Sequence, residues 1–91
     1  MEPIEKALPL DELPVGQRGR VITLDLEGAL RRRIQDLGLI DRTVIEPVHR
    51  GSAGDPTAYL IRGAVVALRR QDAHRIRIQP LPEGGAEARW D

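Results

Sequence analysis

The side chains best suited to bind a metal ion in this sequence are Glu46, His49, Asp72 and His74. Imidazole and carboxylate groups are accepted ligands of divalent transition metals. On one strand, Glu46 and His49 would point to opposite faces, and a helical turn at Asp72 would direct its carboxylate away from His74. No converging ligand cluster follows from these spacings, so we expect the chain to have no specific metal site.

The only serine, Ser52, is the one candidate nucleophile, with His49 as a nearby base. It lacks the glycine–serine–glycine elbow of a hydrolase, and the surrounding Gly51-Ser52-Ala53-Gly54 lacks the lysine and helix of a phosphate-binding loop. The adjacent carboxylates Asp11-Glu12 fall at the end of an element, where acidic residues cap and solvate. We therefore expect no enzymatic activity and no cofactor.

A basic run followed by an apolar run is the feature best suited to bind another protein. Three residues separate Arg31-Arg32-Arg33 from Leu37-Gly38-Leu39-Ile40. Arginine charge would orient an approaching acidic partner, and apolar contacts would hold it. We expect Leu37 to be at least half buried and Leu39 or Ile40 to remain exposed. The predicted contact residues are Arg31, Arg32, Leu37, Leu39 and Ile40.

The same arginines, with those between positions 69 and 77, could instead contact the phosphates of a nucleic acid. Platforms for single-stranded nucleic acid also need aromatic side chains on which the bases stack. The aromatic residues of this chain are Tyr59 and Trp90 alone. Nucleic acid is therefore the less favoured partner, and an RNA-binding barrel remains an alternative.

Short strands and one helix must position these residues. Leu30, Ile34 and Leu37 fall on one face of a helix over about 29–37, and the following Gly38 is typical of a helix end. Short helical turns are expected at 9–13 and 70–73. A small sheet best hides its edges by curling, which predicts an all-β fold: a barrel of about five strands with one inserted α-helix. The predicted strands cover about 18–26, 43–50, 57–61, 64–68 and 75–79.

Length and composition limit the chain to one small domain. It has 91 residues and no net charge. It also has no cysteine, and this excludes disulfides, thiolate metal sites and catalytic thiols. No apolar run approaches the roughly 20 residues that cross a bilayer, and the first residues do not resemble a signal peptide. We expect a cytoplasmic protein without direct membrane insertion. Its predicted parts are an N-terminal lead-in over 1–15, a folded domain over 16–79 and a flexible tail over 80–91.

Several local strings, in their order and spacing, resemble the FeoA domain family. They span about two thirds of the chain, and each string alone would be weak. They are Gly16-x-x-Gly19-x-Val21, Leu30-Arg31-Arg32-Arg33-x-x-Asp36-Leu37-Gly38-Leu39, Gly54-Asp55-Pro56, Arg62-Gly63, Ala67-Leu68-Arg69-Arg70 and Asp72-Ala73-x-x-Ile76.

The resemblance implies an SH3-like barrel and an accessory role in bacterial ferrous-iron uptake. In that role the chain would bind and modulate the cytoplasmic portion of a FeoB-type transporter. The family also includes the C-terminal domain of DtxR-type repressors, so a metal-sensing or dimerising module is an alternative. The link to iron makes binding of ferrous iron conceivable, although no ligand cluster supports it.

Overall fold

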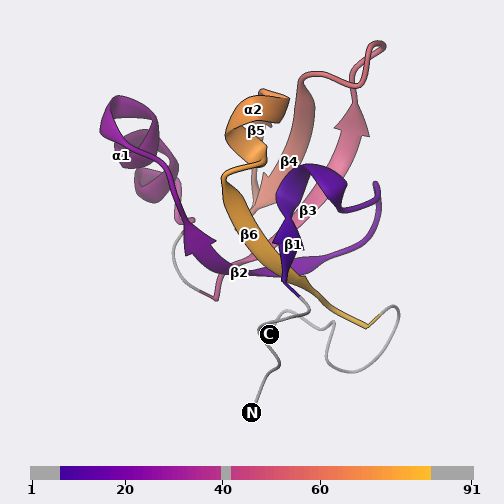
Figure 1. Ribbon diagram of the computed structural model, residues 1–91, viewed down its shortest axis with the longest axis horizontal. Helices are drawn as coiled ribbons and strands as arrows, with labels where there is room; N and C mark the ends of the chain where they lie inside the picture. Colours follow the sequence, from indigo (N-terminus) through magenta and orange to yellow (C-terminus); the bar gives the residue numbers. More distant parts are fainter. Residues whose placement is uncertain (1–6, 40–41, 83–91) are drawn as a thin grey trace.

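The computed structural model describes residues 7–39 and 42–82 of the chain. Six strands and three short helices make up this part (Figure 1). No helix among these residues has the length and apolar character to span a membrane. In chain order the elements are β1 (Leu8–Pro9), the 3₁₀ helix η2 (Leu10–Glu12), β2 (Gly19–Leu24), α1 (Gly28–Asp36), β3 (Val44–Arg50), β4 (Thr57–Ile61), β5 (Ala64–Leu68), α2 (Arg70–Ala73) and β6 (Ile76–Pro80).

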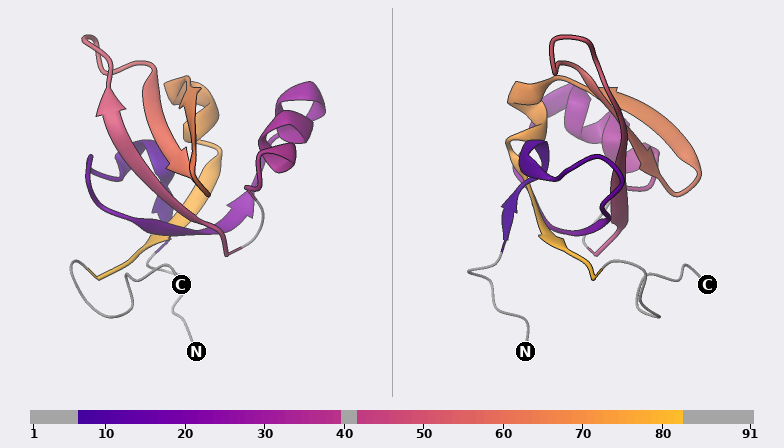
Figure 2. Two further views of the ribbon diagram at one scale, coloured as in Figure 1. Left: turned by 180° about the vertical axis from the view of Figure 1, so that it is seen from behind. Right: turned by 90° about the vertical axis from the view of Figure 1, so that its right-hand side faces the viewer.

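All strands belong to one antiparallel sheet with the order β1-β6-β2-β3-β4-β5. The sheet is strongly curled, so its strands wrap around a common interior (Figure 2). The predicted all-β class with one inserted helix is confirmed. The structure has one strand more than the five expected. This strand is β1, in which Leu8 and Pro9 pair with Ile78 and Arg77 of β6.

Strand β3 contains Pro47. Because proline has no backbone N–H to donate, its presence in a strand predicts either an edge strand or a bulge. β3 is an interior strand, between β2 and β4. Its ladder with β4 shifts register between Pro47 and His49, so the bulge is the correct alternative. The bulge allows Pro47 to be fully buried, with its carbonyl oxygen 2.9 Å from the Gly16 nitrogen that donates to it.

The core lies inside the curl of the sheet. On β4, the alternate residues Thr57, Tyr59 and Ile61 are buried, as expected for a strand with one face turned inward. Leu10 and Leu13 are also fully buried, although they lie within the predicted lead-in 1–15. The folded unit therefore begins near the start of β1 and not at residue 16. Of the predicted tail, residues 83–91 lie outside the described residues.

Helix α1 stands to one side of the curled sheet (Figure 1). It begins and ends one residue earlier than predicted. Ile34 is its one fully buried residue, and Leu30 and Leu37 pack against the core from half-buried positions. The predicted apolar face of the helix is therefore confirmed, and Ile34 is its main anchor.

The C-terminal end of α1 is a Schellman motif. Leu39 donates its backbone N–H to the carbonyl oxygen of Ile34 at 3.2 Å, and Gly38 donates to that of Gln35 at 2.9 Å. Gly38 has a φ of 104°, a left-handed conformation that a residue with a Cβ rarely adopts. The motif folds the chain back so that the side chain of Leu39 enters the core.

Candidate functional site

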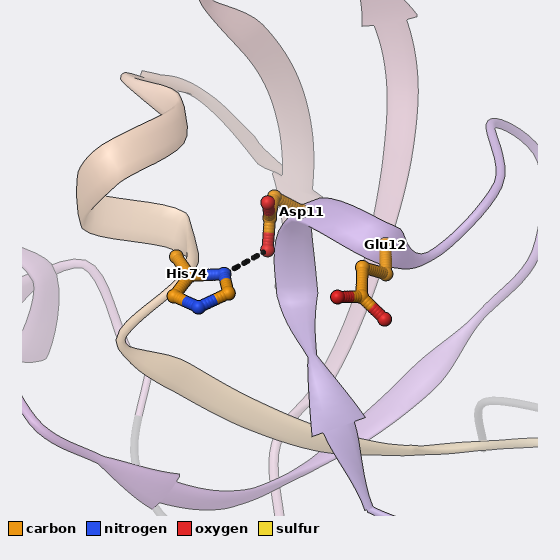
Figure 3. Close-up of side chains that lie close together, drawn as sticks. All are labelled: Asp11, Glu12 and His74. Atoms are coloured by element: carbon orange, nitrogen blue, oxygen red, sulfur yellow. Dashed lines mark hydrogen bonds and ion pairs between the residues drawn. The ribbon is translucent and has the colours of Figure 1, made fainter.

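Three potential metal ligands converge where η2 meets α2 (Figure 3). They are Asp11 and Glu12 of η2 and His74, which caps the C-terminus of α2. One ligand atom from each lies within 4.8 Å of the others. Nδ1 of His74 lies 3.1 Å from Oδ1 of Asp11, and Nε of Arg70 lies 3.6 Å from Oδ2 of Asp11. We call Asp11, Glu12 and His74 the carboxylate–histidine cluster.

Buried neighbours position both elements of this cluster. Leu10 and Leu13, on either side of the two carboxylates, are fully buried, and so is Ala73 of α2. At the start of α2, Oδ1 of Asp55 accepts a hydrogen bond from the backbone N–H of Arg70 at 2.8 Å. This bond satisfies one of the free N–H groups of a helix N-terminus. The cluster therefore depends on core packing as well as on its own polar contacts.

The cluster combines a buried carboxylate with exposed partners. The side chain of Asp11 is 8% exposed, whereas those of His74 and Arg70 are 60% and 75% exposed. In the tautomer that donates Nδ1–H to Asp11, His74 keeps a lone pair on Nε2, which is how a carboxylate commonly orients a histidine ligand. Imidazole and carboxylate are ligand types that divalent transition metals accept, and the Arg70 guanidinium beside Asp11 is a competing positive charge. An open groove of about 580 Å³ adjoins it, lined by Asp11, Glu12, Asp55, Arg70, Gln71 and His74.

This cluster does not follow from the sequence, where Asp11 and Glu12 were assigned to capping and solvation. Of the four ligands considered there, only His74 belongs to the cluster; Glu46, His49 and Asp72 do not. Asp11 and His74 are 63 positions apart and meet because η2 packs against α2. The sign of this cluster in the sequence was the pair of adjacent carboxylates, Asp11 and Glu12, flanked by leucines.

The two arginines predicted to contact a partner have different environments. Arg31 is tied to the body of the domain, because its guanidinium donates hydrogen bonds to the carbonyl oxygens of Leu24 and Leu26. Arg32 is exposed. Arg31 thus helps to hold α1 against the end of β2, while Arg32 remains available to a partner.

The apolar residues predicted to contact a partner are also not equivalent. Leu37 is half-buried. Leu39 is fully buried, so its prediction as an exposed contact was wrong: the Schellman motif places it against the core. Ile40 lies outside the described residues.

Burial raises the pKa of Tyr59 above its ordinary value near 10, although the charge of Arg50 and a hydrogen bond with Thr57 oppose the shift. Arg50 is held near the interior by a hydrogen bond from Nη2 to the carbonyl oxygen of Leu13 at 3.0 Å. Tyr59 is therefore a neutral core residue at physiological pH.

Comparison with known proteins identifies the family. Residues 8–80 match the sequence model of the FeoA domain, a range that begins with β1. The Fe(2+) transport protein A/Fe(2+) transporter FeoB fusion protein of Porphyromonas gingivalis is 31% identical over 70 residues. The match covers 77% of this chain and 8% of that protein, so the chain corresponds to a small part of the fusion protein.

Solved structures agree with this assignment. The FeoA protein of Chlorobium tepidum has 30% sequence identity and a TM-score of 0.79, over 92% of this chain and 81% of that one. The FeoA of Stenotrophomonas maltophilia, described as an SH3 domain protein complexed with zinc, has 28% identity and a TM-score of 0.65, over 77% and 87% of the two chains. The predicted SH3-like architecture is thereby confirmed. The extent of the sequence match and the shared fold together show that this chain belongs to the FeoA domain family.

Proposed function

We propose that this chain is a non-enzymatic, cytoplasmic accessory protein of bacterial ferrous-iron uptake that binds the cytoplasmic portion of a FeoB-type transporter and modulates it. The observation that carries this proposal is the Porphyromonas gingivalis relative, a fusion of transport protein A with the FeoB transporter. Fusion keeps two proteins at a high effective concentration with respect to each other. Two separate chains that act together need a binding interface instead.

The outer side of α1 is the surface that best suits such docking. Arg32 and Arg33 are exposed there, while Ile34 anchors the opposite side of the helix in the core. Arg31, Leu37 and Ile40 stay in the contact set as predicted from the sequence, and Leu39 is removed from it by its burial. Because α1 is fixed at its buried face, its exposed face can meet a partner without losing much conformational freedom.

The test is binding kinetics between this chain and the purified cytoplasmic portion of its FeoB-type transporter. We expect saturable binding, and Arg32→Glu should slow association on the order of tenfold at low salt. Arg69→Glu is the matched control, because Arg69 is also exposed and lies outside the proposed surface. Ferrous-iron uptake should fall in cells that lack the chain.

Absence of both binding and an uptake defect would refute the proposal. Binding of RNA that Arg32→Glu abolishes would support the RNA-binding alternative. Metal-dependent dimerisation without transporter binding would support the alternative of a metal-sensing module.

A second candidate function, binding of a divalent transition metal, is favoured by the carboxylate–histidine cluster. Its side chains supply one imidazole and two carboxylates, and the zinc complex of the Stenotrophomonas maltophilia protein shows that a relative binds a transition metal. Anaerobic calorimetry with ferrous iron, and separately with zinc, should show saturable binding that His74→Ala abolishes and His49→Ala retains. Equal heats for the wild-type chain and His74→Ala would exclude the cluster as the site.

A further inference from the structure

Two arginines with unusual backbone conformations border a groove beside the C-terminal end of α1. The groove has a volume of about 460 Å³ and is lined by Arg42, Thr43, Val44 and Arg62. Arg42 and Arg62 have φ values of 72° and 48°, in the left-handed region that non-glycine residues uncommonly adopt. We call this feature the Arg42–Arg62 groove. Strained backbone of this kind persists where surrounding contacts hold it.

Arg62 is held by a tight turn and by a glycine that faces it. Arg62 and Gly63 connect β4 to β5, with φ values of 48° and 86°. Positive φ at both central residues is typical of a type I′ turn, in which asparagine before glycine is preferred. The stem of Arg62 lies against Gly38, where a Cβ would come within 2.6 Å of Cδ and 3.1 Å of Nε of Arg62. The side chain of Arg62 is therefore positioned beside the end of α1.

The backbone of Arg42 is held by hydrogen bonds on both sides of its Cα. Its backbone N–H donates to the carbonyl oxygen of Val21 at 2.8 Å, and its own carbonyl oxygen accepts from Nη1 of Arg20 at 3.2 Å. The next residue, Thr43, donates from Oγ1 to the carbonyl oxygen of Gly38 at 3.1 Å. Arg20 thus adds a third guanidinium near the groove, and Thr43 ties the groove to the end of α1.

The positive charge of these arginines is not matched within residues 7–39 and 42–82. The ion pairs there join η2 to α2 and join Arg75 to carboxylates before α1. No carboxylate in these ranges forms an ion pair with Arg20, Arg42 or Arg62. A guanidinium binds carboxylates through paired, charge-assisted hydrogen bonds, so the groove is complementary to an anionic ligand.

We propose that the Arg42–Arg62 groove binds the carboxylates of an acidic segment of the transporter's cytoplasmic portion. This inference rests on the proposed function and specifies the chemistry of its contact. Val44 provides an apolar wall against which the stem of a glutamate can pack. An RNA strand fits less well, because no aromatic side chain among residues 7–39 and 42–82 lines the groove to stack on its bases. The binding energy would come from two arginines whose backbone conformation is set before the partner arrives.

The variants Arg42→Asn and Arg62→Asn remove the guanidinium groups and keep the fold, because asparagine tolerates the left-handed backbone at both positions. Arg69→Asn, an exposed arginine at the opposite end of β5, is the matched control. Thermal melts of all variants should stay close to that of the wild-type chain.

The first probe is a blocked hexaglutamate peptide, with hexaglutamine as its uncharged counterpart, titrated into the ¹⁵N-labelled chain. We expect hexaglutamate alone to shift amide signals of residues around Arg42, Arg62 and Gly38, and the double variant to lose these shifts. The double variant should bind the transporter's cytoplasmic portion at least about tenfold more weakly, as expected on loss of charged hydrogen bonds. Arg69→Asn should bind like the wild-type chain.

The outcomes separate this inference from the proposed function. If the wild-type chain binds the transporter and the double variant binds it equally well, the inference is refuted and the proposed function stands. If the wild-type chain does not bind the transporter, the proposed function is refuted, and so is the assignment of the transporter as the partner of the groove. Hexauridylate RNA that produces larger shifts at the groove than hexaglutamate would also overturn the assignment to an acidic protein segment.

Discussion

Replacing Ile34 by alanine should remove the main buried anchor of α1 in the core. Ile34 is fully buried and is the one residue of α1 with no exposure. The substitution deletes two methyl groups and one methylene group, each worth about 0.8 kcal/mol of transfer free energy, for a sum of about 2.4 kcal/mol. Partial relaxation around the resulting cavity adds to this sum, so we expect a loss of about 2–4 kcal/mol in the free energy of unfolding.

Urea denaturation followed by far-ultraviolet circular dichroism measures this change. For a domain of this size each kcal/mol corresponds to about 4–8 °C, so the melting temperature should fall by more than about 8 °C. Gln35→Ala is the matched control, because Gln35 is the next residue of the same helix and is exposed. Its effect should stay within about 0.5 kcal/mol.

An Ile34→Ala loss below about 0.5 kcal/mol, with an unchanged dependence on urea, would refute this reasoning. It would mean that α1 does not pack on the sheet in solution. The proposed docking face would then lack the fixed helix on which it depends.

Three further predictions concern other parts of the core and the candidate metal site. Burial raises the pKa of Tyr59, so the stability that the neutral phenol contributes is complete below about pH 10 and is lost as the pH rises through the higher pKa of the folded state. Thermal melts of Tyr59→Phe at alkaline pH should lack this loss. Identical pH profiles for the variant and the wild-type chain would contradict the prediction. Leu39→Asp would bury an unpaired charge, so circular dichroism should show an unfolded chain at 25 °C, and a folded variant that still binds the transporter would restore Leu39 as a surface residue. Asp11→Asn should lower stability by about 1 kcal/mol by removing the charge that faces His74 and Arg70; a melting temperature equal to that of the wild-type chain in low salt would show that these pairs contribute nothing.

Elements fixed by local spacing were predictable from the sequence. Strands β4 (Thr57–Ile61) and β5 (Ala64–Leu68) and the short helix α2 (Arg70–Ala73) have the bounds expected from their apolar residues and turns. Their side chains alternate or repeat within a few residues, and the intervening Arg62-Gly63 marks a two-residue turn. Local pattern is sufficient there because each boundary depends on neighbouring residues.

Features that depend on distant segments were not predictable in this way. A strand of two residues has no periodicity, and β1 is recognisable only through its pairing with β6. The carboxylate–histidine cluster has the same cause, since η2 and α2 lie near opposite ends of the described chain. The sequence contains the ligands but not the contact between the two helices that brings them together.

The burial of Leu39 decides between two hypotheses that the sequence supports. Gly38 predicts a Schellman motif, in which the residue after the glycine packs against the last helical turn. The apolar run that includes Leu39 predicts an exposed docking contact instead. In the structure the N–H of Leu39 bonds to the carbonyl of Ile34 and its side chain is buried, because burying a leucine is worth about 1.5–3 kcal/mol that exposure to water would forfeit.

Gly38 connects this core packing to the proposed contacts with a partner. Its φ of 104° ends α1 and directs Leu39 inward, and its missing Cβ leaves room for the stem of Arg62. The orientation of α1 and the position of a groove arginine therefore depend on the same residue. A partner segment that contacted both α1 and the groove would meet groups already held relative to one another, so less side-chain entropy would be lost on binding. Exposed arginines on separate flexible loops would lack this advantage.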